Sequence, residues 1–152
     1  MKTVKDILES KQKVFNSIPS KTFVYDALVQ LNSVNLSYLV VMDGHDYRGI
    51  FSERDYTRNV ILKGRASNST LVTEVMTTDL PMVTLKDSVE HCMHIMNAHK
   101  ARYLLAYDDQ QRFAGVITIH DLLRQVIASK EEVFDHSATH ALLDNDESGL
   151  IF

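Results

Sequence analysis

Residues 49–55 read Gly-Ile-Phe-Ser-Glu-Arg-Asp, and residues 115–121 read Gly-Val-Ile-Thr-Ile-His-Asp. Both segments follow one pattern: a glycine, two apolar residues, a hydroxyl residue, two variable residues and an aspartate. The repetition indicates two similar halves, each with its own copy of one supersecondary unit. The motif is typical of a strand that runs into a helix, where a hydroxyl and a carboxylate can hold a ribose and a phosphate.

The residues around the motif repeat in the same order. Residues 4–8 resemble residues 72–76, with apolar ends and an acid at the third position. Apolar residues then recur at spacings of three and four from Val24 and again from Val89, which predicts an amphipathic helix in each half.

Strands are predicted before and after each motif glycine. Residues 38–42 and 103–107 are short apolar runs of the kind expected in buried strands, and each is followed by a turn and by the motif itself. Each half is therefore predicted to be strand, helix, strand, strand, helix. Thr22 and Asp87 are the predicted helix N-caps.

The predicted fold class is α/β (α+β), with two pseudo-symmetric β-α-β-β-α repeats packed sheet to sheet and their helices outward. Neither half is large enough to bury its sheet comfortably alone. The predicted boundaries are a first repeat over residues 1–63, a polar linker over 64–71, a second repeat over 72–129 and an acidic C-terminal tail over 130–152.

The composition of the 152 residues is that of a globular protein, with 45% hydrophobic residues and a net charge of −4. The acidic tail accounts for the negative charge, so the body is near neutral and nucleic-acid binding is not expected. No apolar run approaches the roughly 20 residues of a membrane span, and the N-terminus lacks a signal-peptide core. Cys92 is the single cysteine, so a cytoplasmic protein without an internal disulfide is expected.

Segments 49–55, 72–77 and 115–121, taken in this order and spacing, resemble a tandem pair of CBS domains, the cystathionine-β-synthase-type regulatory modules. The resemblance implies a disc, usually formed by two chains, here a homodimer. It implies adenosine-type ligands (AMP, ADP, ATP, NAD-like or S-adenosylmethionine-like) in clefts between the repeats, with no required cofactor. It also implies regulation of an unknown protein effector rather than catalysis.

The resemblance assigns ligand contacts to the motif residues. It implies that Asp55 and Asp121 bind ribose hydroxyls, and that Ser52 and Thr118 meet the ribose or phosphate. It also implies that Arg54 meets a phosphate.

Two further residues are candidates near the second motif. His120 takes the position of Arg54, so it is either a phosphate contact or a surface histidine. Arg102 precedes a buried strand and points either into a cleft or to solvent. Tyr38 and Tyr103 replace the residues common in the family and are expected to narrow or reshape the clefts.

Alternative interpretations accompany each candidate. A hydroxyl followed by an acid three residues later is also an ordinary helix cap, in which case the protein is a ligand-free dimerisation or docking scaffold. Capping and ligand binding can also alternate in the same residue. His91 and His94 are three positions apart, but no acid or cysteine completes a metal site, and a solvated helix face is expected. No catalytic motif is present, so an enzyme is not expected.

Overall fold

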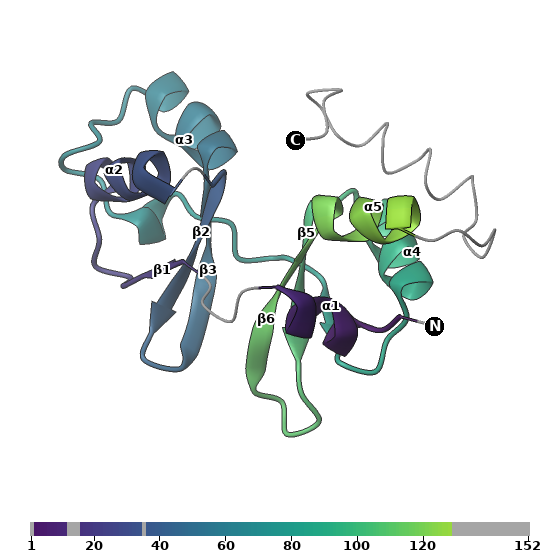
Figure 1. Cartoon of the computed structure of the whole chain (residues 1–152). Coiled ribbons are helices and arrows are strands. Elements are labelled where there is room, and N and C mark those ends of the chain that lie inside the picture. Colours follow the sequence, from purple (N-terminus) through teal and green to yellow (C-terminus); the bar gives the residue numbers. More distant parts are fainter. Residues whose placement is uncertain (1, 12–15, 35, 129–152) are drawn as a thin grey trace. The chain divides into compact units, whose positions relative to one another are not determined.

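The computed structural model describes residues 2–11, 16–34 and 36–128, which divide between two compact units (Figure 1). One unit joins residues 2–11 to the described residues from Leu80 onward, and the other consists of the described residues of Val14–Asp79. The acidic tail lies outside the described residues. None of the described helices is long and apolar enough to cross a bilayer.

The unit formed by Val14–Asp79 contains a three-stranded sheet in the order β1-β2-β3. Strand β1 pairs in parallel with β2, and β2 forms an antiparallel hairpin with β3. Its elements, in chain order, are β1 Ser17–Ile18, α2 Val24–Val34, β2 Tyr38–Asp43, β3 Asp46–Ser52, α3 Glu53–Asn59 and the 3-10 turns η1 Ile61–Lys63 and η2 Val72–Glu74.

The other unit repeats this arrangement with a sheet in the order β4-β5-β6, again with one parallel and one antiparallel pair. Its elements are α1 Val4–Ser10, β4 Met82–Thr84, α4 Val89–His99, β5 Tyr103–Tyr107, β6 Phe113–Thr118 and α5 Ile119–Ala128. The predicted order of strand, helix, strand, strand and helix is therefore confirmed in both halves, and so is the mixed α/β class.

The predicted N-caps are wrong by one residue each. Ser88, not Asp87, caps α4, because its Oγ accepts a hydrogen bond of 3.0 Å from the backbone N–H of His91. The Asp87 carboxylate instead accepts from the N–H of Thr84 in the preceding turn. Helix α2 begins at Val24, so Thr22 lies one position too early to cap it.

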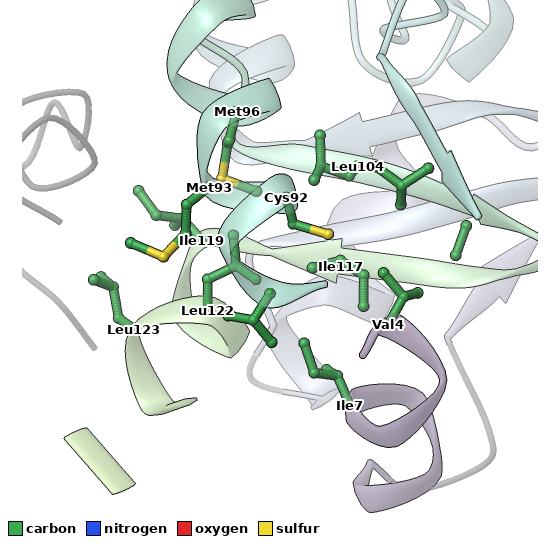
Figure 2. Packing of buried hydrophobic residues seen from close by; sticks show 13 residues of the cluster. Val4, Ile7, Cys92, Met93, Met96, Leu104, Ile117, Ile119, Leu122 and Leu123 are labelled. Atoms are coloured by element: carbon green, nitrogen blue, oxygen red, sulfur yellow. The ribbon is translucent and has the colours of Figure 1, made fainter. Parts of the chain in front are cut away.

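Each unit has its own apolar core. Figure 2 shows the core of the unit that contains β4–β6, where side chains from α1, α4 and α5 gather against the strands. Cys92, Met93 and Met96 are fully buried there, which confirms that this face of α4 is core. The second core lies in the other unit and includes these buried residues of α2, β2 and β3: Val24, Ala27, Leu31, Leu39, Val41 and Phe51.

Each half of the sequence begins with a leading segment, residues 4–8 or residues 72–76. In the structure, each leading segment belongs to the compact unit that contains the sheet of the other half. Helix α1 opens the chain but belongs with β4–β6, whereas η2 opens the second half but belongs with β1–β3. Two backbone hydrogen bonds, of 2.8 and 2.9 Å, pair Thr77 with Ile50 of β3. The compact units therefore differ from the sequence halves, and the repeat limits of 1–63 and 72–129 stay a prediction about the sequence repeat.

Candidate functional site

The first motif forms a closed capping box at the junction of β3 and α3. Ser52 is the N-cap of α3, and its Oγ accepts a hydrogen bond of 3.2 Å from the N–H of Asp55. In return, Oδ2 of Asp55 accepts from the N–H of Ser52 at 2.9 Å and from its hydroxyl at 3.0 Å. The capping interpretation of this motif is therefore confirmed.

The second oxygen of Asp55 is also engaged. The hydroxyl of Thr77 donates to Oδ1 at 2.8 Å, so neutral groups of Ser52 and Thr77 donate to both oxygens of this carboxylate. Asp55 is only 6% exposed. Burial raises its pKa above the ordinary value, because desolvation disfavours the charged form more than the hydrogen bonds from Thr77 and Ser52 favour it.

The second motif repeats the box at the junction of β6 and α5. The N–H of Thr118 donates to Oδ2 of Asp121 at 2.9 Å, and the N–H of Asp121 donates to the Thr118 hydroxyl at 3.1 Å. Asp121 is 3% exposed. Equivalent residues in the two halves therefore adopt the same local geometry, as the repeated sequence predicts.

In the second motif, two charged side chains donate hydrogen bonds to the carboxylate. Nζ of Lys11 donates to Oδ2 of Asp121 at 2.8 Å, and a guanidinium nitrogen of Arg124 donates to Oδ1 at 2.7 Å. Burial pushes the pKa of Asp121 upward, but the charge and hydrogen bond of Lys11, with those from Thr118 and Arg124, outweigh it and lower the pKa below the ordinary value. Two equivalent carboxylates thus have pKa values displaced in opposite directions.

The predicted phosphate contacts lie close to their motifs in the chain. Arg54 and His120 are half-buried and occupy the same position of the first helical turn in α3 and α5. Arg102 is half-buried as well, and its carbonyl accepts a hydrogen bond of 3.1 Å from the N–H of Ile119, where α5 begins. The ligand roles of all three remain predictions.

The two tyrosines flank the motif hydroxyls. Tyr38 is the strand partner of Ser52, and Tyr103 is the strand partner of Thr118. Both side chains are half-buried. The narrowing of the clefts by these two rings stays a prediction.

The two motif glycines, Gly49 and Gly115, leave space for the leading segments to approach the strands closely. A Cβ on Gly49 would lie 2.7 Å from Sδ of Met76 and 2.9 Å from the carbonyl oxygen of Thr77. A Cβ on Gly115 would lie 2.9 Å from a methyl group of Leu8. Since residues 4–8 and 72–76 are the matching segments of the repeat, each glycine provides space for the same part of the other half.

Sequence reasoning missed Thr77, Lys11 and Arg124 as partners of the motif carboxylates. Arg124 could have been found, because it lies three positions after Asp121 on the predicted helix. Lys11 is separated from Asp121 by 110 positions, and no local pattern joins them. Thr77 ends a recognisable segment, but the sequence does not indicate that this segment pairs with β3.

Metal binding finds no support in the part of the chain that the structure describes. No group of three or more histidine, cysteine, aspartate or glutamate residues lies close enough there to hold an ion. Nε2 of His94 lies 3.8 Å from a carboxylate oxygen of Glu90, one turn away on the same helix.

Comparison with known proteins adds independent evidence. The family model described as "CBS domain" matches residues 72–128. A relative from Arabidopsis thaliana, the mitochondrial CBS domain-containing protein CBSX3, is 30% identical over 139 residues, which cover 86% of this chain and 67% of the relative.

Solved structures show the same architecture. A putative signal-transduction protein with CBS domains from Burkholderia ambifaria MC40-6 is 35% identical, has a TM-score of 0.77, and matches 88% of this chain and 100% of that protein. The structure of CBSX2 in complex with AMP has a TM-score of 0.68 at 22% identity, matching 85% of this chain and 98% of the other. At that identity the similarity to CBSX2 establishes the fold alone.

Proposed function

Since this chain belongs to the CBS-domain proteins, we propose that it is a regulatory module that binds an adenine nucleotide and signals its presence to a protein effector. The observation that carries the proposal is that both motif carboxylates, Asp55 and Asp121, are buried beside a helix N-terminus, so that at least one of them is placed to accept a ribose. A carboxylate can accept two hydrogen bonds from a ribose diol, and the N–H groups of the helix favour a phosphate. AMP bound to CBSX2 supports the ligand class.

A bound nucleotide would replace some of the hydrogen bonds that the motif carboxylates accept within the protein. Each carboxylate accepts a hydrogen bond from the backbone N–H of its cap residue, Ser52 or Thr118. A ribose hydroxyl is a neutral donor, so where it takes the place of another neutral donor, binding replaces one hydrogen bond by another at little net cost. Arg54 and His120 then face the phosphate side of this proposed arrangement.

Calorimetric titration with AMP, ATP, NAD and S-adenosylmethionine tests the proposal. Saturable binding of at least one ligand is expected, and the Asp55→Asn/Asp121→Asn double variant should lose it while remaining folded. The asparagines preserve size and one acceptor but remove the charge that strengthens hydrogen bonds from the ribose hydroxyls. Undiminished binding by the double variant would contradict the assigned residues.

A ligand-free scaffold is the second candidate, and the closed capping boxes favour it. Every carboxylate oxygen of Asp55 and Asp121 already has a donor within the protein. Thermal unfolding separates the candidates, because a nucleotide at 100 times its Kd adds about 2.7 kcal/mol to the free energy of unfolding. A scaffold would show no rise with any of the four ligands.

The proposal includes a homodimer. Tyr25 and Val29 lie one helical turn apart on α2 and are 57% and 53% exposed, so this apolar pair is available to a partner. Sedimentation equilibrium should give a dimer for the wild type and a monomer for Tyr25→Lys/Val29→Lys. A monomeric wild type at micromolar concentration would contradict this part of the proposal.

The remaining parts of the proposal concern activity and location. A non-enzymatic role accords with the signal-transduction description of the Burkholderia relative. A cytoplasmic location remains a prediction, and the Arabidopsis relative is described as mitochondrial. Fluorescence of the tagged full-length protein in its native cell distinguishes the two compartments.

A further inference from the structure

The two motif carboxylates differ in the kind of donor that the leading segment brings to them. In one unit, Thr77 offers a neutral hydroxyl to Oδ1 of Asp55. In the other unit, Lys11 offers an ammonium group to Oδ2 of Asp121. Both residues follow the matching leading segments of the repeat, so this segment supplies a neutral donor to one motif carboxylate and a charged donor to the other.

Lys11 is held in place by more than the carboxylate. Its Nζ also donates a hydrogen bond of 2.9 Å to the carbonyl of Val116, and its backbone N–H caps the end of α1 by bonding to the carbonyls of Ile7 and Leu8. The Lys11 side chain is 29% exposed, whereas the carboxylate it meets is almost completely buried. The Lys11 ammonium group is therefore held in a fixed position beside the second motif.

Arg124 contributes less to closing this site. Its side chain is 65% exposed, and solvent screens an ion pair with such a partner. It also lies on the same helix as Asp121 and can move away without disturbing another element. Lys11 is thus the residue that distinguishes the second motif from the first.

Ribose binding has different consequences at the two carboxylates. At Asp55, a sugar hydroxyl can take the place of the Thr77 hydroxyl, one neutral donor for another. At Asp121, the same exchange would replace a charge-assisted hydrogen bond, about twice as strong as a neutral one. It would also leave an ammonium group beside the site without its counter-charge.

We propose that only the first motif binds a nucleotide, with Asp55 accepting hydrogen bonds from the ribose. The ion pair with Lys11 prevents Asp121 from binding a ribose in the same way. This inference rests on the proposed nucleotide binding and adds which motif is used and which residue decides it. Lys11 acts through Asp121 and is a specificity-determining residue.

Calorimetry on the full-length chain tests the proposal with AMP, ATP, NAD and S-adenosylmethionine as probes. The wild type should bind one ligand per chain, Asp55→Asn should abolish binding, and Asp121→Asn should leave it unchanged. Lys11→Met keeps the aliphatic length of the side chain and removes its charge, so a second site per chain should appear. That second site should vanish again in Lys11→Met/Asp121→Asn.

Two controls separate the Lys11 effect from a general loss of charge on α1. Lys5→Met removes an ammonium group from the same helix, where the side chain is 64% exposed, and should leave the stoichiometry at one. Lys11→Arg retains the charge and should do the same. Replacing AMP by 2′-deoxy-AMP should weaken binding about tenfold or more in the wild type, because Asp55 loses one of the two hydroxyls it accepts from.

The possible results distinguish this inference from the function on which it rests. Binding that is lost in Asp121→Asn and kept in Asp55→Asn would overturn the inference and leave nucleotide binding intact. A Lys11→Met protein that stays at one site would overturn the role of Lys11. If that variant does not fold, the comparison of Asp55→Asn with Asp121→Asn still decides which carboxylate is used. No binding of any of the four probes by any variant would overturn nucleotide binding and the inference together.

Discussion

The hydroxyl of Thr77 donates a hydrogen bond of 2.8 Å to Oδ1 of Asp55, across 22 positions of the chain. The same threonine exchanges two backbone hydrogen bonds with Ile50 of β3. One residue therefore ties the segment after η2 both to the strand that leads into the first motif and to the carboxylate that ends it. Thr77 is as much a part of the first motif as Ser52.

Replacing Thr77 by valine should lower the free energy of unfolding by about 1 kcal/mol, or up to about 3 if the unsatisfied carboxylate is not rehydrated. The valine keeps the shape of the side chain and removes only the donor. Urea denaturation measures the loss. Thr78→Val changes the neighbouring, exposed threonine and should have little effect, so equal losses in the two variants would show that the hydrogen bond is unimportant.

Gly49→Ala should be more damaging than its single added methyl group suggests. The new Cβ would lie 2.9 Å from the carbonyl oxygen of Thr77, a backbone atom that accepts a hydrogen bond from Ile50 and cannot move away alone. We expect a loss of about 1–3 kcal/mol from overpacking. Gly44→Ala is the matched control: its Cβ meets nothing within 4 Å, although its positive φ of 64° adds a backbone cost of about 1 kcal/mol. A smaller loss at Gly49 than at Gly44 would contradict the close approach.

The opposite pKa shifts of Asp55 and Asp121 predict opposite contributions to acid stability. The folded-state pKa of Asp121 is below its ordinary value of 3.8, so this carboxylate stabilises the fold above about pH 3.8, and the contribution is lost as the pH falls through the lowered value. The folded-state pKa of Asp55 is raised, so its contribution grows as the pH falls through that raised value toward 3.8.

Carbon-13 NMR of the side-chain carboxyl groups checks both directions in one titration. The Asp121 signal should have its midpoint below 3.8 and the Asp55 signal should have its midpoint above it. Asp121→Asn should reduce the fall in the free energy of unfolding at acid pH. Asp55→Asn should remove the opposite contribution, the rise in that free energy as Asp55 is protonated. Midpoints in the reverse order would show that the charged neighbours of Asp121 are not engaged in solution.

Lys11→Met should raise the pKa of Asp121, because burial then acts without its largest opposing influence. It should also lower the free energy of unfolding by about 1–3 kcal/mol, since the buried carboxylate loses a charged donor. Adding Asp121→Asn should recover part of this loss, because the uncompensated charge is removed as well. A double-mutant cycle with simple additivity would mean that the two groups do not interact.

Cys92 should be inert in the folded protein. It is completely buried in the α4 core, and burial raises the pKa of its thiol to about 12, so almost no reactive thiolate is present near neutral pH. A disulfide reagent should label it only as fast as the unit opens, and at once in concentrated urea. Rapid labelling without denaturant would show that this core is not closed.

Much of the local structure can be predicted from the sequence because its signals are local. The apolar runs from Tyr38 and Tyr103 predict strands, and the structure has strands that begin at these residues. The spacing of apolar residues from Val89 predicts a helix with Cys92, Met93 and Met96 inward, and all three are buried. These patterns depend on periodicity within about ten residues, which the amino-acid sequence displays directly.

The long-range partners could not be predicted in the same way. Nothing in the spacing of Lys11 connects it to Asp121, and Thr77 was grouped with the half that it precedes. The N-caps were misplaced by one residue, since Ser88 and Asp87 are both good caps and only the turn geometry at Thr84 decides between them. The motif residues lie where the sequence predicts, at the end of a strand and the start of a helix, but the donors Thr77 and Lys11 are distant from them in sequence.

Because each leading segment packs with the sheet of the other half, neither half of the sequence is structurally complete alone. A protein made of one such half would lack the segment that packs beside its motif glycine, and its own copy of α1 or η2 would have no sheet to pack on. Only a second copy could supply both, so a single half is expected to fold as a pair. Cleavage between the halves would leave each leading segment on a different fragment from the sheet it packs on. Mixing the two fragments should then restore the fold that neither fragment forms alone.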